Sequence, residues 1–417
     1  MIKLPARFRD YLSLDVIEFL ALLCLIPFFQ PACIDSFVLY GIKVSLFSLI
    51  GKCFTAMRLA ISCSAILLFF LKINEIKRKM NFTMFSILLS IILLVAVSGI
   101  VNSARVTVLL SYMYDIGLLC LFELMILHGR NSFLKIITKL FGALSFLGAA
   151  SIIAFPHGFN HAYDVHNAIY FLGSKNAAIN VYIIFFMALW GEALHDGTKM
   201  PKRSVFYLVI FMLTGVIMGS GSTMVCVLGM ACIYVNFGSL HGKITIAPIV
   251  PFVVIAVAVV AVYVGSMSPL ILHLLEMMGR DTTFSGRTIL WRQALRYYNN
   301  NVMFGAGIDI VYHNFSGIVQ YSAHSQFLDR LAKYGLIPFI PFVASFVYME
   351  KQLMFTKLKK MSSMLGLFIA LYLLRMGFDV YSLYYIFTIA YLCNLFTRKE
   401  DDDLSSLLSI FGIKLER

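Results

Sequence analysis

Charge is scarce in this sequence of 417 residues. Only 13% of the residues are charged and 60% are hydrophobic, whereas a soluble domain carries about a quarter charged residues. A soluble globular fold is therefore excluded, and the composition predicts an all-α polytopic membrane protein. The formal net charge of +13 does not indicate nucleic acid, because the basic residues gather in short turns between apolar segments, as they do in cytoplasmic loops.

The sequence also lacks the cysteine patterns of metal sites and disulfide frameworks, and it lacks a signal-peptide cleavage site. Eight cysteines are present, but none forms a CxxC pair and no histidine stands at metal-ligand spacing from them. Most lie inside apolar segments, where a thiol acts as a small buried hydrophobe. We therefore expect no metal, no cofactor and no disulfide framework. The first apolar stretch has no small-residue cleavage site, which indicates an uncleaved first helix.

Apolar stretches long enough to cross a bilayer recur along the chain. A spanning helix needs about 20 apolar residues, and basic turns set its direction. We predict about twelve transmembrane helices, at 12–29, 52–71, 83–101, 106–127, 136–155, 177–194, two within 204–237, and at 244–265, 331–348, 362–376 and 380–396. The glycine-serine run at 219–222 is predicted to be a tight outer hairpin. Residues 36–50 are predicted to be interfacial or re-entrant, because another complete span would put the basic turn at 72–79 outside.

These assignments divide the chain into four parts. Residues 1–265 form an N-terminal bundle of nine helices, 266–330 a large extracytoplasmic loop, 331–396 the last three helices, and 397–417 a cytoplasmic tail. Both termini are then cytoplasmic, and the absence of lysine from 266–330 agrees with this orientation. Chemistry in the loop would take place where no ATP or nucleotide sugar exists. A substrate there must already carry its leaving group, as a lipid-linked pyrophosphate does.

The predicted loop is rich in arginine. It contains Arg280, Arg287, Arg292, Arg296 and Arg330. Guanidinium offers a planar fork of donors that pairs with phosphate or carboxylate. We predict a helix from Gly286 to about Tyr298, which puts Arg287 and Trp291 one turn apart on one face and directs its first amide groups toward an anion. A solvated loop at the lipid interface would explain the same arginines without a ligand.

A histidine and an intramembrane arginine are further candidates. His324 ends the loop, and a histidine there can take a proton from a sugar hydroxyl near neutral pH. The alternative is a hydrogen-bonded structural histidine. Arg58 lies inside a predicted span, where a charge is costly enough to suggest a site. The alternative is an arginine that reaches out to the interface.

Four short motifs follow one another on the predicted outer face. They are FLGSKNAAIN, SGRTILW, FGAGI and AHSQFLDRLAKYGLIPF. In this order they resemble the bacterial O-antigen polymerase/ligase superfamily, which includes Wzy-type polymerases and lipid A-core O-antigen ligases. The resemblance covers roughly 173–338 by motif and the whole chain by topology. It implies a GT-C-like fold and a metal-independent glycosyltransferase that uses undecaprenyl-pyrophosphate-linked oligosaccharide.

The resemblance also implies roles for the loop residues. Arg280 and Arg287 would bind the pyrophosphate, beside Trp291. His324 would act on the acceptor hydroxyl as a base.

Other residues would complete the substrate site. Lys175 and Asn176 would help to hold the lipid-linked donor. The family often has an arginine after the glycine-serine hairpin, where this chain has Thr223. The missing phosphate contact is therefore expected from Arg58 or Arg375.

The function expected from the resemblance is that of a surface-polysaccharide polymerase for O-antigen, capsule or exopolysaccharide. It would lie in the cytoplasmic membrane with its active site on the periplasmic or extracellular side. The expected partners are the lipid-linked oligosaccharide, membrane lipid, a chain-length regulator and a flippase, but not nucleic acid.

Two alternatives stay open. A ligase that moves the glycan onto a lipid core or a protein would share the fold and the site. A flippase would use Arg58, Asp115 and Glu123 along a transport pathway, although transporters tend to have internal repeats and we find none.

Overall fold

The computed structural model describes residues 16–31, 33–34, 45–160, 168–174, 176–238, 245–265, 287–314, 317, 319–356 and 358–397. These residues are mostly helical, as the composition predicts. The one sheet among them pairs β1 (Tyr312–His313) with β2 (Val319–Gln320) in antiparallel register.

The helices follow the order of the apolar segments. They are α2 (Val16–Leu25), α4 (Ser45–Leu71), α5 (Ile73–Lys79), α6 (Phe82–Val101), α7 (Val106–His128), α8 (Arg130–Ala154), α9 (Ala178–His195), α10 (Arg203–Ile217), α11 (Gly221–Phe237), α12 (Ile249–Gly265), α14 (Arg287–Asn300), α15 (Gln326–Tyr334), α16 (Leu336–Phe355), α17 (Lys359–Gly377) and α18 (Leu383–Thr397).

Several of these helices could cross a membrane. Within the described ranges, six are long and apolar enough: α6, α7, α8, α9, α17 and residues 48–71 of α4. Shorter apolar helices accompany them, namely α2, α10, α11, α18 and residues 249–260 of α12. The prediction of a multi-pass helical membrane protein is confirmed. The count of twelve spans and the GT-C-like architecture stay predictions.

Side-chain caps fix the helix starts that matter for the site. The hydroxyl of Ser220 accepts a hydrogen bond from the Thr223 amide at the start of α11, and Ser325 caps α15 through the amide of Leu328. Such caps satisfy amide groups that a helix leaves unpaired. Gly219, just before the first cap, has φ +58°, so the predicted hairpin at 219–222 is confirmed as a tight turn.

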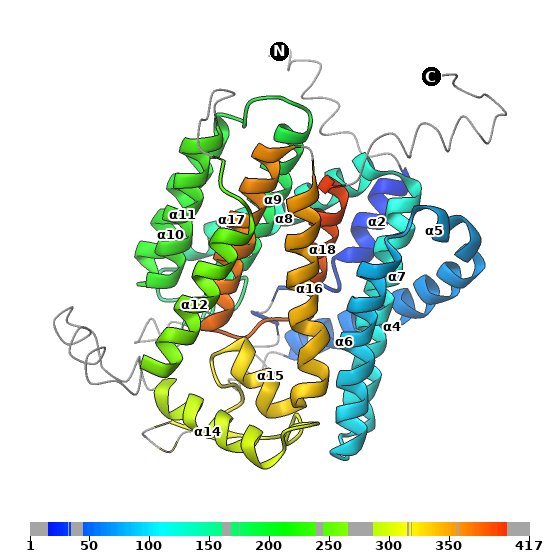
Figure 1. The fold of residues 1–417 in the computed structure, drawn as a ribbon, viewed down its shortest axis with the longest axis vertical. Coiled ribbons are helices and arrows are strands. Elements are labelled where there is room, and N and C mark those ends of the chain that lie inside the picture. The colour runs from blue at the N-terminus through cyan, green and yellow to red at the C-terminus, as the bar shows by residue number, and fades with distance from the viewer. Residues whose placement is uncertain are drawn as a thin grey trace.

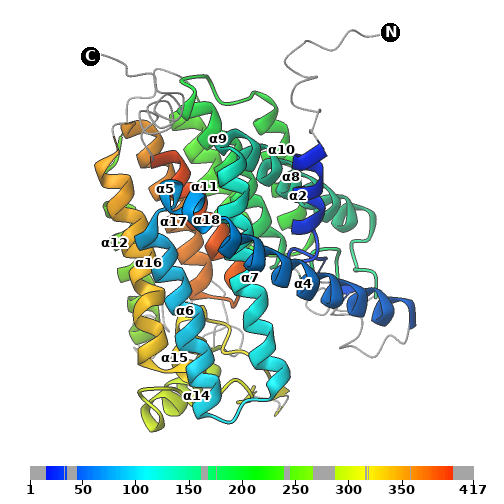
Figure 2. The same cartoon turned by 90° about the vertical axis from the view of Figure 1, so that its right-hand side faces the viewer.

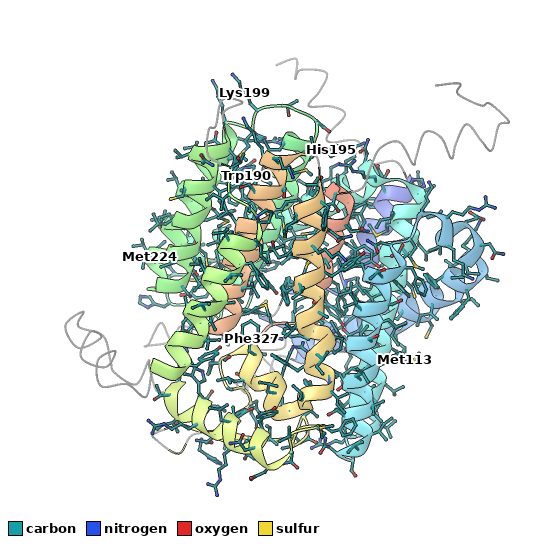
Figure 3. The ribbon with its side chains drawn as sticks, viewed as in Figure 1. Met113, Trp190, His195, Lys199, Met224 and Phe327 are labelled. Carbon is teal, nitrogen blue, oxygen red and sulfur yellow. The ribbon has the colours of Figure 1, made fainter. Side chains whose placement is uncertain are left out.

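Most of the long helices run roughly along one axis, although α4 does not, and two short helices close one end. In Figure 1, α6, α7, α12 and α16 descend toward α14 and α15, which lie across the lower end of the bundle. His195, the last residue of α9, and Lys199, in the turn that follows, lie at the opposite end (Figure 3). The loop helices α14 and α15 and the basic turn at Lys199 therefore lie at different ends of the molecule.

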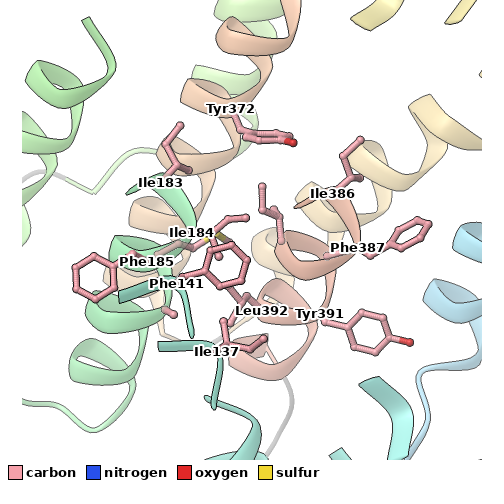
Figure 4. Close-up of a cluster of buried hydrophobic side chains, with 14 of the residues drawn as sticks. Ile137, Phe141, Ile183, Ile184, Phe185, Tyr372, Ile386, Phe387, Tyr391 and Leu392 are labelled. Atoms are coloured by element: carbon pink, nitrogen blue, oxygen red, sulfur yellow. The ribbon is translucent and has the colours of Figure 1, made fainter. Parts of the chain in front are cut away.

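The core is built around α9. Of its apolar window 83% is buried, against 17% for α4. Figure 4 shows α9 residues Ile183, Ile184 and Phe185 among side chains of α8, α17 and α18. Figure 2 shows α4 crossing α7 obliquely and extending away from the bundle. α9 is therefore the central helix, and α4 is a peripheral one with apolar faces left for lipid.

Two boundaries differ from the sequence prediction. Residues 45–50 continue α4 instead of forming a separate interfacial piece, while 36–44 lie outside the described residues. The predicted helix at 331–348 is divided at Gly335, whose φ of +79° ends α15 before α16 begins. A left-handed residue of this kind commonly ends a helix, so the loop structure extends to Gly335 and not only to 330.

Candidate functional site

Polar side chains from five parts of the chain meet at the end of the bundle that α14 and α15 cover. They come from the turn before α9, the turn between α10 and α11, the start of α14, the segment before α15, and the end of α17 with the turn that follows it. Their contacts join Asn176, Ser220, Arg287, His324, Arg375 and Asp379 into one group.

Arg375 is the buried centre of this group. Its side chain is 1% exposed, and Nη2 donates both to the backbone oxygen of Asn176 at 3.1 Å and to Oδ2 of Asp379 at 2.9 Å. The Nε and Nη1 atoms have no hydrogen-bond partner. The guanidinium therefore ties the N-terminal turn of α9 to the turn after α17. Because so little of it is exposed, it offers little surface for the predicted phosphate contact, and its substrate-binding role stays a prediction.

Asp379 joins this arginine to the candidate base. Its Oδ1 lies 3.7 Å from Nδ1 of His324, and Oδ1 also accepts the amide of Val380 at 3.0 Å. Burial alone would raise the pKa of Asp379, but the interaction with His324 and the positive charge of Arg375 hold that pKa well below its usual value. The carboxylate therefore stays ionised at neutral pH.

His324 is held in an unusual backbone conformation. Its φ is +49°, in the left-handed region that a non-glycine residue enters only at a cost. The next two residues fix it: the Ser325 hydroxyl bonds that of Tyr263 on α12, and the Gln326 side chain accepts the amide of Tyr381 at 2.6 Å. The ring turns Nδ1 toward the carboxylate, and its opposite edge carries Nε2. With 35% of the side chain exposed, a substrate can reach that edge.

Arg287 reaches the same group from the first residue of α14. It is half-buried and interacts electrostatically with Asp379 and Arg375. Burial lowers the pKa of Arg287, and the negative charge of Asp379 opposes this effect. The guanidinium of Arg375 pairs with Asp379, and that of Arg287 interacts with the same carboxylate electrostatically, which leaves a net positive charge beside His324. Such a group suits an anionic ligand.

The packing of Trp291 decides which face of α14 turns inward. The indole is 2% exposed and lies 5.0 Å from the ring of Tyr263 and 6.3 Å from that of Phe378. Arg292 and Arg296 are exposed on the outer face. The helix and the common face of Arg287 and Trp291 are as predicted, but Trp291 is a core residue of the loop and offers little surface to a sugar.

Asn176 connects the site to the glycine-serine hairpin. Its Oδ1 accepts hydrogen bonds from Ser220 at 2.9 Å and from Ser222 at 3.4 Å, while its backbone oxygen meets Arg375. Two of the predicted outer features, the turn before α9 and the hairpin at 219–222, are therefore in direct contact.

The two glycines of the FGAGI motif seat the loop on α15. Gly305 and Gly307 have φ values of +70° and +92°, and the amides of Ala306 and Gly307 donate to the carbonyls of Ala332 and Lys333. A Cβ on Gly305 would lie 2.4 Å from the carbonyl carbon of Lys333. The sharp bend predicted for these glycines is confirmed, and it allows a backbone approach that a side chain would block.

This geometry can be compared with known proteins. Residues 206–343 match the O-antigen ligase family. The resemblance to the O-antigen polymerase/ligase superfamily is thereby confirmed for this part of the chain, which contains Arg287 and His324. No curated protein and no solved structure matches the chain. The family match supports a function of the polymerase or ligase type in a multi-pass membrane protein and does not distinguish the two.

Some predicted residues lie elsewhere. Arg280 and Lys175 are outside the described residues. Arg58 lies on α4, where its guanidinium carbon is 5.7 Å from the ring centroid of Tyr114, away from the contacts that join Arg375, Asp379 and His324. The substrate-binding roles of these residues stay predictions.

Sequence reasoning missed Asp379 as a member of the site. The residue was visible as one of an Arg375–Asp379 pair at i, i+4 spacing, which indicates a contact on a helix, but nothing local pointed to His324. Tyr263 and Gln326, which orient the histidine segment, carried no sequence signal of that role.

The arrangement offers acid–base chemistry and anion binding together. A carboxylate faces one edge of an accessible imidazole, and a half-buried arginine lies beside the same carboxylate. Among the residues that the structure describes, no three His, Cys, Asp or Glu side chains gather to hold a metal ion. Metal independence itself stays a prediction.

Proposed function

We propose that this protein is a polymerase that joins oligosaccharide repeat units linked to undecaprenyl pyrophosphate, on the outer face of the cytoplasmic membrane. The observation that carries the proposal is the His324–Asp379–Arg375 chain with Arg287 beside it, at the end of the bundle opposite the basic turn at Lys199. In this proposal the protein is a glycosyltransferase that needs no nucleotide sugar.

His324 is the general base of the proposed reaction. Asp379 faces Nδ1 of the ring, which leaves Nε2 to accept a proton from the attacking sugar hydroxyl. The carboxylate stabilises the imidazolium that forms, because it remains ionised beside Arg375. General-base assistance of this kind contributes about two to four powers of ten in rate.

Arg287 acts on the leaving group. The hydroxyl oxygen of an incoming lipid-linked repeat attacks the anomeric carbon of the growing chain. The new glycosidic bond forms as the bond from that carbon to the pyrophosphate oxygen breaks, and His324 takes the hydroxyl proton. Undecaprenyl pyrophosphate leaves with the electron pair of the broken bond, and Arg287 stabilises the charge that builds on it. Arg375 positions Asp379 and takes no part in the bond changes.

A ligase is the second candidate. The family model that matches residues 206–343 is described by that activity, and the same base and arginine would serve a lipid core or a protein acceptor. The two functions differ only in what brings the hydroxyl to His324.

Deletion of the gene in its native host tests the proposal. The surface and lipid-linked glycans are separated on a gel, with the wild-type gene and a His324→Ala variant returned on plasmids. A polymerase predicts single repeat units on the surface in place of a ladder, restored by the wild-type gene only. Full-length polymer that stays on undecaprenyl pyrophosphate would identify a ligase. Repeat units trapped on the cytoplasmic side would identify a flippase and refute the proposal.

A further inference from the structure

A buried ion pair lies on α15, behind the candidate base. Asp329 and Lys333 stand one turn apart, and Oδ2 of the carboxylate lies 2.9 Å from Nζ of the ammonium group. Only 5% of the Asp329 side chain and 11% of the Lys333 side chain are exposed, so neither group is open to a substrate. Taking two charges out of water is costly, and their mutual attraction repays that cost only with further hydrogen bonds. The other contacts of the pair show what it holds.

Both side chains reach back to the segment that precedes His324. The second carboxylate oxygen of Asp329, Oδ1, accepts the backbone amide of Ala323 at 2.9 Å, in a buried hydrogen bond. The ammonium group of Lys333 donates to the backbone oxygen of Tyr321 at 2.8 Å. Hydrogen bonds with a charged partner are roughly twice as strong as neutral ones. Residues 321–323 are therefore fastened to α15 at two points.

His324 lies between two fixed neighbours. On one side, Ala323 is fully buried and its amide is held by Asp329. On the other side, Ser325 is fully buried, and its hydroxyl caps α15 and bonds that of Tyr263. A non-glycine residue stays in the left-handed region only where its surroundings over-determine it. The φ of +49° at His324 is therefore imposed from both sides, and the bond to Asp329 supplies one of them.

The direction of the imidazole ring depends on this backbone. Nδ1 of His324 lies 3.7 Å from Oδ1 of Asp379, and 35% of the histidine side chain is exposed. Packing alone therefore does not hold the ring against the carboxylate. A change in the backbone at Ala323 would move the Cβ atom of His324 and, with it, the ring.

We propose that Asp329 and Lys333 are positioning residues for the transfer reaction, which act through His324 and touch no substrate themselves. The inference rests on the proposed function, in which His324 takes the proton of the acceptor hydroxyl. Asp329 fixes the amide just before the histidine, and Lys333 neutralises that carboxylate while it holds Tyr321. A displacement of about 1 Å can cost about a hundredfold in rate. The alternative is a pair that only stabilises α15.

Asp329→Asn and Lys333→Gln, made singly and together, test the pair. Asparagine can still accept the Ala323 amide, but it leaves the ammonium group of Lys333 buried without its carboxylate. Glutamine can still donate to the Tyr321 oxygen, but it leaves the carboxylate without its cation. The two amides together can form all three hydrogen bonds without charge. Removing one member of a buried ion pair is far more damaging than replacing both.

The full-length proteins are reconstituted in vesicles, and the probe is the lipid-linked repeat unit extracted from a native host that lacks the gene. The initial rate of polymer formation gives kcat and KM, measured below the unfolding temperature of every variant. Tyr391→Phe is the matched control for stability, because it removes a buried hydrogen bond to Glu123 in the core of the bundle (Figure 4). If Asp329→Asn does not fold, Lys333→Gln and the double variant make the same test.

The expected result is a loss of kcat that the second change repairs. Each single change lowers kcat about ten- to a hundredfold and leaves KM within about twofold, because the substrate contacts remain. The double variant returns kcat to within about threefold of wild type. In the His324→Ala background, Asp329→Asn causes no further loss of the residual rate, because residues that act as a unit are not additive. Tyr391→Phe lowers the unfolding temperature and keeps the wild-type kcat.

Other results would overturn the inference. Single variants that unfold at lower temperature but keep the wild-type kcat would show that the pair only stabilises α15. An equally large effect of Asp329→Asn in the His324→Ala background would show that the pair does not act through the histidine. In both cases polymerisation by the wild type, and its loss in His324→Ala, would uphold the proposed function. Absence of polymerisation by the wild-type protein would refute the proposed function and the role of the pair with it.

Discussion

Asp379→Asn is the most informative change to the candidate site. The amide keeps the shape of the carboxylate but removes the negative charge that faces both Arg375 and His324. Arg375 is 1% exposed and Asp379 17% exposed, so solvent cannot replace the lost charge. The backbone contact from Arg375 to Asn176 remains. We therefore expect a protein that still inserts and folds, with a misoriented base.

Two magnitudes follow from this geometry. Breaking a buried ion pair by removing one partner costs about 3–5 kcal/mol, and the partial exposure of Asp379 places this change toward the lower value. Catalysis falls further, because His324 loses the group that orients its ring and stabilises its charged form. The loss expected for general-base help is about a hundredfold to ten-thousandfold in rate.

The pH dependence of unfolding separates the charge from the shape. The pKa of Asp379 is held below its usual value, so its contribution to stability is complete above the unfolded pKa of about 3.9 and is lost as pH falls through the lower folded value. Thermal unfolding of the wild type in detergent should therefore lose stability below about pH 4. Asp379→Asn should lack this part of the loss.

Asp309→Asn is the matched control, because Asp309 is an exposed carboxylate of the same region. It should leave both the transfer rate and the acid dependence of unfolding unchanged. Asp379→Asn with a wild-type transfer rate would refute the role of Asp379 in orienting the base. If Asp379→Asn lost stability at acid pH in the same way as the wild type, the carboxylate of Asp379 would not be held ionised by Arg375 and His324.

Three further changes test the rest of the site. Arg287→Lys should reduce polymer formation in cells to less than about a tenth of the wild-type amount, because a point charge lacks the planar fork of guanidinium donors. The control Arg292→Lys should keep the wild-type ladder. Full activity of Arg287→Lys would mean that only the charge matters. His324→Ala should lower transfer by about two to four powers of ten without loss of membrane insertion, and wild-type chain lengths would exclude it as the base. Gly305→Ala should lower the unfolding temperature, because its φ is +70° and the added Cβ meets backbone of α15. The control Gly317→Ala is also at positive φ but has open space around it, so it should cost only about 1 kcal/mol. Equal losses of stability in the two variants would exclude the steric explanation.

Helix ends and turns could be predicted from the sequence because their signals are local. The hairpin at 219–222 and the outer turn between α6 and α7 lie where hydropathy and turn residues placed them. Gly335 was harder, since the pattern on both sides of it is helical and only its φ of +79° separates α15 from α16. The periodicity of an amphipathic helix does not reveal that it stops and a second helix begins in another direction.

The composition of the site could not be predicted, because it depends on how helices dock. His324 and Asp379 are separated by three helices, and their contact requires α15 to lie against the end of α17. The hydrogen bond from Tyr381 to Gln326 and the bond of Tyr263 to Ser325 hold it there. None of these pairs is close in sequence, so no local pattern records them.

The arginines of the loop show what decides between equal candidates. Arg287, Arg292 and Arg296 occupy one short helix and have the same chemistry, yet only Arg287 turns toward Asp379. Trp291 makes that choice, because burying its indole against Tyr263 and Phe378 fixes the rotation of α14. The residue one turn before the tryptophan must then face inward. In this amphipathic loop helix, the arginine that faces inward is therefore better identified by its spacing from the largest apolar anchor than by the number of arginines around it.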